Sequence, residues 1–212
     1  MTQNQSFIHC FEPANRLEAP PLLLLHGTGG DENDLLPLGR AVSPGSALLS
    51  VRGKVLEHGM PRFFLRLAEG VFDEDDVVRR ANELADFVED ARKQYDIGAP
   101  IALGYSNGAN IAAAMLLLRP NVLAGGFLIR AMVPLSRPPK ADLSGKPVQI
   151  LSGLRDPIIP ADNGEALAAM LRNAGADVDR RVVPVGHELS QSDLVLAREW
   201  MAARSVPATH DA

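Results

Sequence analysis

Residues 100–110 read Pro-Ile-Ala-Leu-Gly-Tyr-Ser-Asn-Gly-Ala-Asn, and they set the architecture of the chain. The first four residues form a short apolar run typical of a buried strand, and the pattern from Asn107 onward predicts a helix. Between them Gly104-Tyr105-Ser106-Asn107-Gly108 forms a G-x-S-x-G pentapeptide, which in this setting indicates a nucleophile elbow. Glycines are needed there because a β-carbon would clash with the neighbouring strand and helix. An ordinary serine cap in a glycine-rich turn is the alternative.

Short apolar runs alternate with longer helical patterns along the whole chain. The runs predict strands at residues 21–25, 47–51, 100–103, 126–129, 148–151 and 178–183, with an antiparallel edge strand at 7–11. Helices are predicted at residues 31–40, 73–95, 107–119, 162–173 and 190–204, with caps at Asn33 or Asp34, Asp162 and Ser190. The alternation predicts an α/β fold, with a mostly parallel central sheet and helices on both faces.

Length and composition restrict the class of protein. The chain has 212 residues, 46% of them hydrophobic and 22% charged, which predicts one globular domain over residues 1–212. A net charge of −5 does not suit a phosphate backbone, so nucleic-acid binding is not expected. One cysteine, Cys10, fits a reducing compartment. The sequence has no secretory signal pattern and no bilayer-length apolar run, so we expect a cytoplasmic protein without stable membrane association.

A glycine-rich loop, His26-Gly27-Thr28-Gly29-Gly30-Asp31, directly follows the strand at residues 21–25. Its exposed backbone N–H groups could stabilise an oxyanion, and His26 is expected to shape the loop rather than act as a base. A dinucleotide-binding loop is one alternative. However, Glu32 occupies the third glycine position, and Arg52 stands where an acidic residue is expected. A plain glycine turn is the other alternative.

Two more strand ends carry chemically useful side chains. Asp156 follows the strand at 148–151, and His187 follows the strand at 178–183. Because the carboxyl ends of parallel strands meet at one edge of a sheet, we expect Ser106 to lie near both. An imidazole can take the serine proton, and a buried carboxylate can hold the imidazole in one tautomer. The order serine, aspartate, histidine is the order expected of α/β-hydrolases.

Simpler interpretations remain open at these positions. Asp156 precedes a proline and could be an ordinary turn carboxylate, while His187 could be a solvated loop histidine. Asp142 and Asp162 are the alternative acids. The five histidines show no metal-binding spacing, so a metal site is not expected.

Residues 21–200 resemble the short phospholipase/carboxylesterase branch of the α/β-hydrolase superfamily, and are most similar to bacterial carboxylesterases linked to methylhydroquinone and quinone stress. The matching segments are residues 24–34, 51–53, 59–64, 104–110, 132–134 and 186–187. The resemblance implies a serine carboxylesterase that forms an acyl-enzyme and needs no cofactor. Ser106, Asp156 and His187 would be its triad. The oxyanion donors would be the backbone N–H groups of Thr28 and Asn107.

The resemblance leaves the substrate class open. The superfamily includes acyl-protein thioesterases and lysophospholipases, whose elbow usually has glutamine before the second glycine and another glycine after it. Here Asn107 and Ala109 occupy those positions, which argues against thioesterase activity on lipidated proteins. Esters of small soluble compounds are expected, with a lysophospholipase or an acyl thioesterase as the alternative. A non-catalytic, hydrolase-fold protein that binds small molecules is the alternative of another class. Relatives are often dimers, so the resemblance leaves a homodimer open.

The segment at residues 131–146 bears on access to the site. It is proline-rich and too short for a cap domain, so we expect an open cleft. The candidate lining residues are Met60, Phe63, Phe64, Met132, Pro134 and Ile158. Arg62, beside two phenylalanines, could clamp a substrate carboxylate. A surface arginine or an ion-pair partner is the alternative at that position.

Overall fold

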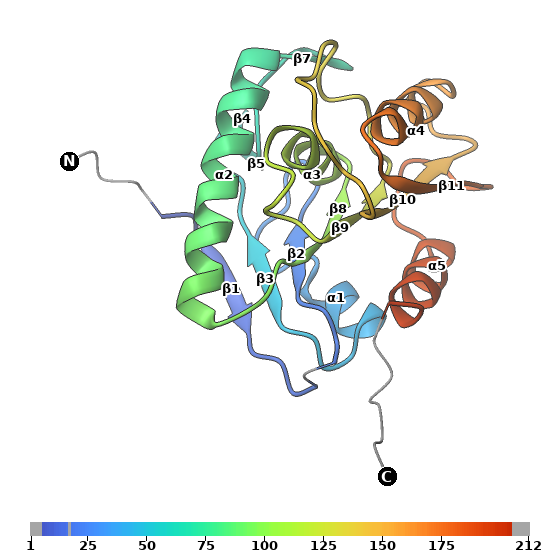
Figure 1. Cartoon of the computed structure of the whole chain (residues 1–212). Helices are drawn as coiled ribbons and strands as arrows, with labels where there is room; N and C mark the ends of the chain where they lie inside the picture. Colours follow the sequence, from blue (N-terminus) through green and yellow to red (C-terminus); the bar gives the residue numbers. More distant parts are fainter. Residues whose placement is uncertain (1–5, 17, 205–212) are drawn as a thin grey trace.

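The computed structural model describes residues 6–16 and 18–204, and a seven-stranded sheet runs through its centre (Figure 1). The strand order is β1-β3-β2-β8-β9-β10-β11. The strands are β1 (His9–Glu12), β2 (Leu22–Leu25), β3 (Leu48–Val51), β8 (Ile101–Tyr105), β9 (Gly125–Ile129), β10 (Pro147–Gly153) and β11 (Asp177–Val183). In this sheet β1 pairs antiparallel with β3, and every other pair is parallel. The predicted parallel sheet and its antiparallel edge strand are therefore confirmed.

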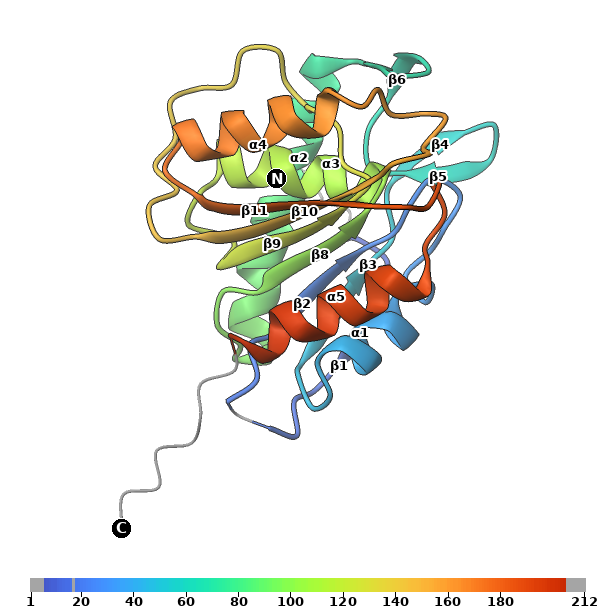
Figure 2. The ribbon, with the colours of Figure 1, turned by 90° about the vertical axis from the view of Figure 1, so that its right-hand side faces the viewer.

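Helices cover both faces of the sheet, as Figure 2 shows. One layer contains α2 (Glu74–Tyr95), α3 (Asn107–Leu118) and α4 (Asn163–Asn173), and the opposite layer contains α1 (Leu36–Val42) and α5 (Gln191–Ala202). Each layer encloses its own apolar core, because the side chains of a strand alternate between the two faces: Leu23 and Leu25 belong to one core, Leu22 and Leu24 to the other. The predicted α/β fold without a large cap domain is confirmed.

The chain buries α3 from all sides. Every residue from Asn107 to Leu117 is buried, and the helix packs against both α2 and the sheet. Its alanine-rich sequence permits this close packing, because small side chains leave little volume between the helix and its neighbours. A helix enclosed in this way holds its first turn, and therefore the elbow before it, in a fixed position.

Of the three predicted helix starts, that of α1 is wrong, that of α4 is in the right place but without the predicted cap, and that of α5 is confirmed with its cap. Helix α1 begins at Leu36, because Asp31 instead forms a turn in which its carboxylate accepts the Asn33 N–H at 2.7 Å, and no side chain caps the helix. At α4 the side chain of Asp162 makes no capping hydrogen bond. Ser190 and Asp193 form the reciprocal capping box of α5.

Two small antiparallel hairpins, which the sequence did not predict, lie between β3 and α2. They pair β4 (Val55–Glu57) with β5 (Met60–Arg62), and β6 (Arg66–Ala68) with β7 (Val71–Phe72). Figure 2 shows them beyond the carboxyl ends of the central strands. Among the described residues, no helix combines the length and the apolar character that a membrane span requires.

Candidate active site

The chain order of the sheet reverses between β2 and β8. From β2 the chain proceeds through α1 to β3 on one side, and from β8 it proceeds through α3 to β9 on the other. Because α1 and α3 lie on opposite faces, the loops after β2 and β8 separate and leave a crevice at the sheet edge. The glycine-rich loop and the serine elbow are these two loops, so the fold itself places them together.

The elbow has the sharp geometry that its glycines predict. Ser106 has φ +51° and ψ −115°, a conformation that L-residues rarely adopt and that costs backbone energy. A β-carbon at Gly104 would lie 2.7 Å from the Cα of Ala109, and one at Gly108 would collide with the carbonyl of Leu25. The turn therefore brings strand and helix so close together that only glycine fits on either side of the serine.

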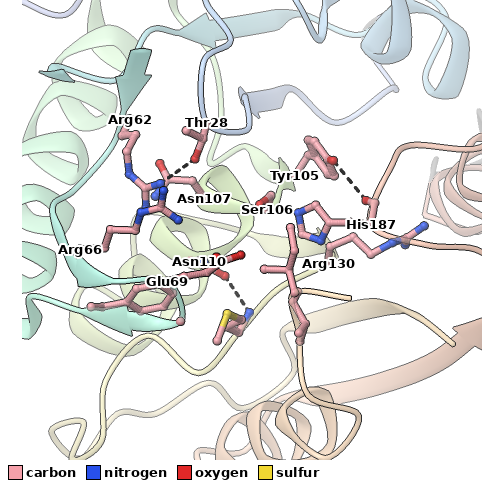
Figure 3. Close-up of a pocket in the computed structure, with 15 residues that line it drawn as sticks. Thr28, Arg62, Arg66, Glu69, Tyr105, Ser106, Asn107, Asn110, Arg130 and His187 are labelled. Carbon is pink, nitrogen blue, oxygen red and sulfur yellow. Dashed lines mark hydrogen bonds between the residues drawn. The ribbon is translucent and has the colours of Figure 1, made fainter. Parts of the chain in front are cut away.

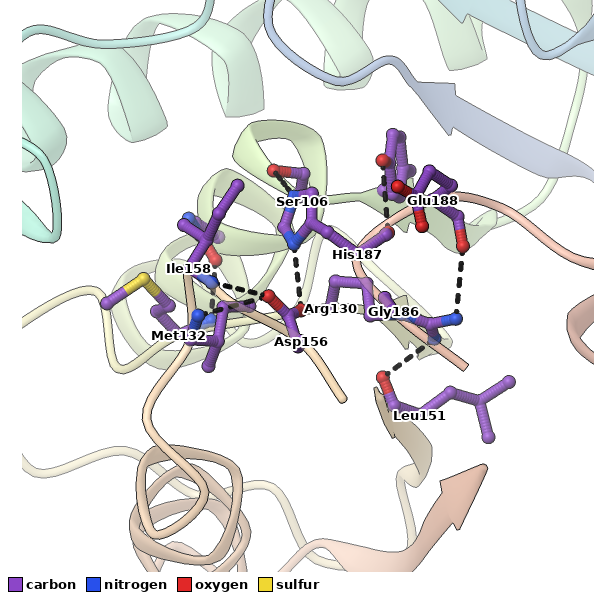
Figure 4. A network of polar contacts seen from close by, with 12 residues as sticks. Ser106, Arg130, Met132, Leu151, Asp156, Ile158, Gly186, His187 and Glu188 are labelled. Atoms are coloured by element: carbon purple, nitrogen blue, oxygen red, sulfur yellow. Dashed lines mark hydrogen bonds and ion pairs between the residues drawn. The ribbon is translucent and has the colours of Figure 1, made fainter. Parts of the chain in front are cut away.

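Ser106, His187 and Asp156 form a hydrogen-bonded series, which Figure 4 shows. The Ser106 Oγ lies 2.9 Å from His187 Nε2, and His187 Nδ1 lies 2.8 Å from Asp156 Oδ2. The other carboxylate oxygen of Asp156 accepts the backbone N–H groups of Ile158 and Ile159 at 2.9 and 3.1 Å. With only 2% of its side chain exposed, Asp156 is fixed from both sides. An Nδ1–H donated to this carboxylate leaves Nε2 free to accept the serine proton.

Asp142, one of the alternative acids, has no contact with the imidazole. Its carboxylate accepts the backbone N–H of Ser144 at 3.0 Å in a solvent-exposed turn. Asp162, the other alternative, stands immediately before α4. Of the three aspartates considered, only Asp156 is bonded to His187.

Arg130 holds the loop that carries His187. This buried residue follows β9 with φ +54°, and its guanidinium forms two 2.9 Å hydrogen bonds to the carboxylate of Asp193. The same guanidinium donates to the carbonyl oxygens of Gly186 at 2.9 Å and Glu188 at 3.3 Å, on either side of the histidine. The Tyr105 hydroxyl donates to the His187 carbonyl at 3.1 Å. Three consecutive carbonyls of this loop are thus fixed by side chains from the ends of β8 and β9.

The residues predicted to supply the oxyanion donors, Thr28 and Asn107, both line the pocket around Ser106. Within residues 6–16 and 18–204, neither residue's backbone N–H donates a hydrogen bond. Their side chains are held by one segment: the Thr28 hydroxyl accepts from Arg62 at 2.8 Å, and the Asn107 carbonyl accepts the Phe63 N–H at 2.7 Å. Arg62 and Phe63, at the end of β5, therefore hold the two residues whose N–H groups are the predicted oxyanion donors.

His26 shapes the glycine-rich loop, as the sequence predicted. Its buried ring contacts the Gly27 carbonyl through Nδ1 at 2.6 Å and accepts the Gly53 N–H through Nε2 at 3.0 Å. Burial lowers the pKa of His26 below its ordinary value, because a charged ring would lose its hydration there. A neutral imidazole thus connects the loop after β2 to the chain that enters the first hairpin.

The pocket around Ser106 has a volume of about 320 Å³. Of the predicted lining residues, Arg62, Met132 and Ile158 lie on its wall. The predictions for Phe63 and Phe64 are wrong, because both rings are buried in the core, where Phe63 packs on His26 and Phe64 on Phe72. The remaining two, Met60 and Pro134, are not among the described residues that line this pocket.

Sequence reasoning missed several residues of the pocket. These are Arg66, Glu69, Gly70, Phe72, Tyr105, Asn110, Arg130 and Ile159 (Figure 3). Three of them had a usable signal: Tyr105 and Asn110 flank the elbow within residues 100–110, and Arg130 directly follows a predicted strand. Arg66 had none, because the hairpin that carries it was not predicted.

Comparison with known proteins finds close relatives. A Bacillus subtilis (strain 168) protein named as a hydrolase, MhqD, is 50% identical over 181 residues, which cover 84% of this chain and 90% of that protein. A Bacillus cereus carboxylesterase structure matches with a TM-score of 0.91 and 45% identity, over 95% of this chain and 96% of the other. A Mesorhizobium loti carboxylesterase matches with a TM-score of 0.88 and 32% identity, over 92% and 94%. No protein-family model matches this chain.

The parallel sheet, the serine elbow and the polar strand ends define the α/β-hydrolase class. Within that class the chain belongs to the carboxylesterase branch that includes MhqD. It is therefore an enzyme with esterase function, and the alternative of a non-catalytic binding protein is wrong.

Proposed function

We propose that the chain is a serine carboxylesterase that hydrolyses esters of small soluble compounds through an acyl-enzyme. In this proposal Ser106 is the nucleophile, His187 the general base and acid, and Asp156 the residue that orients the imidazole. One observation carries it: the hydrogen-bonded series from the Ser106 hydroxyl through His187 to Asp156, at the wall of a pocket.

Acylation begins when the Ser106 Oγ attacks the ester carbonyl carbon and His187 Nε2 accepts the hydroxyl proton. The carbonyl electron pair moves onto oxygen, and the N–H groups of Thr28 and Asn107 are the donors proposed to hold this oxyanion. The first turn of α3 adds a positive helix end beside Ser106. When the tetrahedral intermediate collapses, the bond to the leaving oxygen breaks and His187 delivers the proton to it, releasing the alcohol.

Deacylation repeats these steps with water. His187 takes a proton from water, whose oxygen attacks the Ser106 ester, and the serine oxygen recovers that proton when the acyl group leaves as a carboxylic acid. The net reaction consumes one ester and one water and yields one acid and one alcohol. With this water, the protein and the ester supply every atom and proton that the two steps need.

The dimensions of the pocket support small substrates. A volume of about 320 Å³ lies at the low end of the range for ligand pockets, roughly 300–1,000 Å³. The segment at residues 131–146, where larger lipases place a lid, contains neither helix nor strand. A lysophospholipase or acyl thioesterase would need room for a long acyl chain, so short soluble esters are the better proposal.

The Ser106→Ala variant tests the nucleophile. We expect kcat for p-nitrophenyl acetate to fall by about 4–6 decades, equivalent to about 5–8 kcal/mol. The exposed Ser192 on α5 provides the matched control, and Ser192→Ala should react at the wild-type rate and accept a fluorophosphonate probe. If Ser106→Ala retains a tenth of the wild-type rate, or still accepts the probe, the proposal is wrong.

The acid is tested separately, by comparing Asp156→Asn with Asp142→Asn. The first change leaves an amide that favours the wrong histidine tautomer, and we expect kcat to fall by about 10⁴-fold. The second alters an exposed turn and should leave kcat near the wild-type value. The reverse result would assign the orienting role to Asp142.

Substrate size is tested with a series of p-nitrophenyl esters of increasing acyl length. We expect kcat/KM to be highest for short acyl groups, because the pocket is small. A steep rise beyond roughly eight carbons, where each additional CH₂ contributes up to about 0.8 kcal/mol, would favour a lipid substrate instead.

A further inference from the structure

One wall of the Ser106 pocket carries two arginines from the small hairpins. Arg62 is the last residue of β5, and Arg66 is the first of β6. Both line the pocket, and Figure 3 shows their guanidinium groups side by side, next to Asn107. Two adjacent cations beside a nucleophile need a chemical explanation, because neither takes part in the hydrolytic steps above.

The hydrogen bonds of this wall leave several donors unused. Arg62 donates through Nε to the Phe64 carbonyl, and through Nη1 to Thr28 and Glu57. Arg66 donates through Nε to Glu57 at 2.8 Å. Among the described residues, Arg62 Nη2 and both terminal nitrogens of Arg66 have no acceptor.

Asn107 adds an unsatisfied buried donor to the same wall. Only 2% of the residue is exposed, and its carbonyl is occupied by the Phe63 N–H. Its amide nitrogen, Nδ2, is buried and has no acceptor within the described part of the chain. A buried donor without a partner is costly, so this group indicates an acceptor that the protein does not supply.

The two hairpin arginines share one ion-pair partner. Glu57 pairs with both arginines, at 3.3 and 2.8 Å, so a single carboxylate faces two guanidinium groups. Burial lowers the pKa of Arg62, because the contacts with Glu57 do not offset the lost hydration of the cation. Arg130, the third cation on the pocket wall, is neutralised by Asp193. Glu69 lines the pocket at an exposed turn and is paired with neither hairpin arginine in the described structure.

We propose that Arg66, Arg62 and Asn107 form a subsite for a carboxylate, and that the preferred substrates are compact esters with a second, free carboxylate group. Guanidinium groups bind carboxylates through paired hydrogen bonds, and the amide nitrogen of Asn107 provides a further donor. The subsite rests on the proposed esterase function and deepens it. Because the ester is cleaved as described above, the carboxylate takes no part in bond making or breaking.

The carboxylate could belong to the acyl part or to the alcohol part of the ester. Monomethyl succinate carries it on the acyl side, with methyl pentanoate as its neutral counterpart. Acetoxyacetate carries it on the alcohol side, with propyl acetate as its neutral counterpart. In each pair the ratio of kcat/KM for the anionic ester to that for the neutral ester measures the preference, and acid release is followed by titration. We expect a ratio above one in at least one pair.

The Arg66→Gln variant tests the subsite, because the Arg66 side chain is partly exposed and, among the described residues, its one ion-pair partner is Glu57. We expect the preference ratio to fall by about 10- to 100-fold, mainly through KM, since a charge-assisted hydrogen bond is lost. Arg66→Lys keeps the charge but not the paired geometry, and should lose less. Glu57→Gln should raise the ratio, because it removes the competing carboxylate.

Arg119 provides a matched control, with 28% of its side chain exposed against 31% for Arg66, and with carboxylate partners on α2. Arg119→Gln should leave the ratio unchanged. A wild-type ratio of one or less in both pairs overturns the subsite, as does an unchanged ratio in Arg66→Gln together with no rise in Glu57→Gln. Those results leave the esterase proposal intact, because its own test is the loss of neutral-ester turnover in Ser106→Ala.

Discussion

The loops at the strand ends and the hairpins opposite them form the two walls of one pocket, but they are fixed by different means. The strand-end loops continue the hydrogen bonding of the sheet: Ser106 donates to Ile129, Arg130 to Leu151, and Leu154 to Val183, each backbone bond being 2.8 Å long. The hairpins, residues 55–72, form two separate two-stranded sheets. They contact the strand ends through bonds such as the one that the Phe63 N–H donates to the side-chain carbonyl of Asn107.

The groups proposed to catalyse the reaction and those proposed to select the substrate therefore lie on parts of the chain that are fixed in different ways. The groups proposed to make and break bonds lie on loops whose backbone is continuous with the buried sheet, where displacements are opposed by many hydrogen bonds at once. The two arginines proposed to select the substrate lie on the hairpins, whose short strands expose apolar side chains such as Leu56 and Leu67. A pocket wall of this kind can change in sequence without disturbing the sheet, which is how one fold serves many substrates.

The largest effect is expected on the strand-end side, at Arg130. Arg130→Met would leave the buried carboxylate of Asp193 without its cation, and we expect the free energy of unfolding to fall by about 3–5 kcal/mol in a urea titration. The double variant Arg130→Met/Asp193→Asn removes both charges and should recover much of that loss.

Measuring kcat distinguishes two roles of Arg130, stabilising the fold and positioning the loop that carries His187. In the double variant the carbonyls of Gly186 and Glu188 still lack their donor, so the loop that carries His187 is less well positioned. We expect kcat to remain about 10- to 100-fold below wild type, with a smaller change in KM. Full recovery of kcat together with stability would show that Arg130 acts only on the fold.

A smaller effect is expected where the first hairpin joins the strand-end side, at Gly53. A β-carbon there would collide with the backbone of Arg62, so Gly53→Ala should lower the free energy of unfolding by about 1–3 kcal/mol. Gly98, whose β-carbon would meet open space, is the control, and Gly98→Ala should stabilise the protein by up to about 1 kcal/mol. Thermal unfolding of the two variants provides the comparison. If both variants unfold at the same temperature, the hairpin has shifted enough to accommodate the added methyl group at residue 53.

The smallest effect concerns pH and involves His26, which links the two sides through the Gly53 N–H. Burial lowers the pKa of His26 in the folded state, whereas in the unfolded chain it titrates near its ordinary value of about 6.5. Below that pH the unfolded chain binds a proton that the folded chain does not. The stabilisation is therefore complete above about pH 6.5 and is lost as the pH falls, at up to about 1.4 kcal/mol per pH unit.

His26→Gln should make the free energy of unfolding less dependent on pH in that acidic range, because the titrating group is gone. Urea titrations of both proteins at a series of pH values measure the difference, and contributions from the other four histidines cancel. Parallel curves for variant and wild type would contradict the link between burial of His26 and acid sensitivity.

The sequence was most informative where burial is continuous. The central strands read as unbroken apolar runs because both their faces are covered, and the strand-end rule then predicted that Ser106, Asp156 and His187 would meet. Asn33, by contrast, was one of the two residues predicted to cap a helix, but the carboxylate of Asp31 forms a local turn with it. This carboxylate accepts the Asn33 N–H within the loop, so α1 starts later than predicted.

The hairpins could not be predicted, for two physical reasons. Their strands are two or three residues long, too short for an alternating pattern to stand out. Their positions depend on contacts with distant residues, such as the bond from Gly29 to the Pro61 carbonyl. Phe63 and Phe64 were placed in the pocket for the same reason, because nothing local distinguishes a core ring from a pocket ring.

Strand β11 ends the sheet opposite β1, and its free edge has a consequence for self-association. An open edge carries N–H and C=O groups that could pair with a strand of another molecule. Along β11, however, Asp177, Asp179 and Arg181 are exposed, and the last two form a 3.0 Å ion pair. A neighbouring strand would have to desolvate these charges, so the edge discourages the growth of a continuous intermolecular sheet.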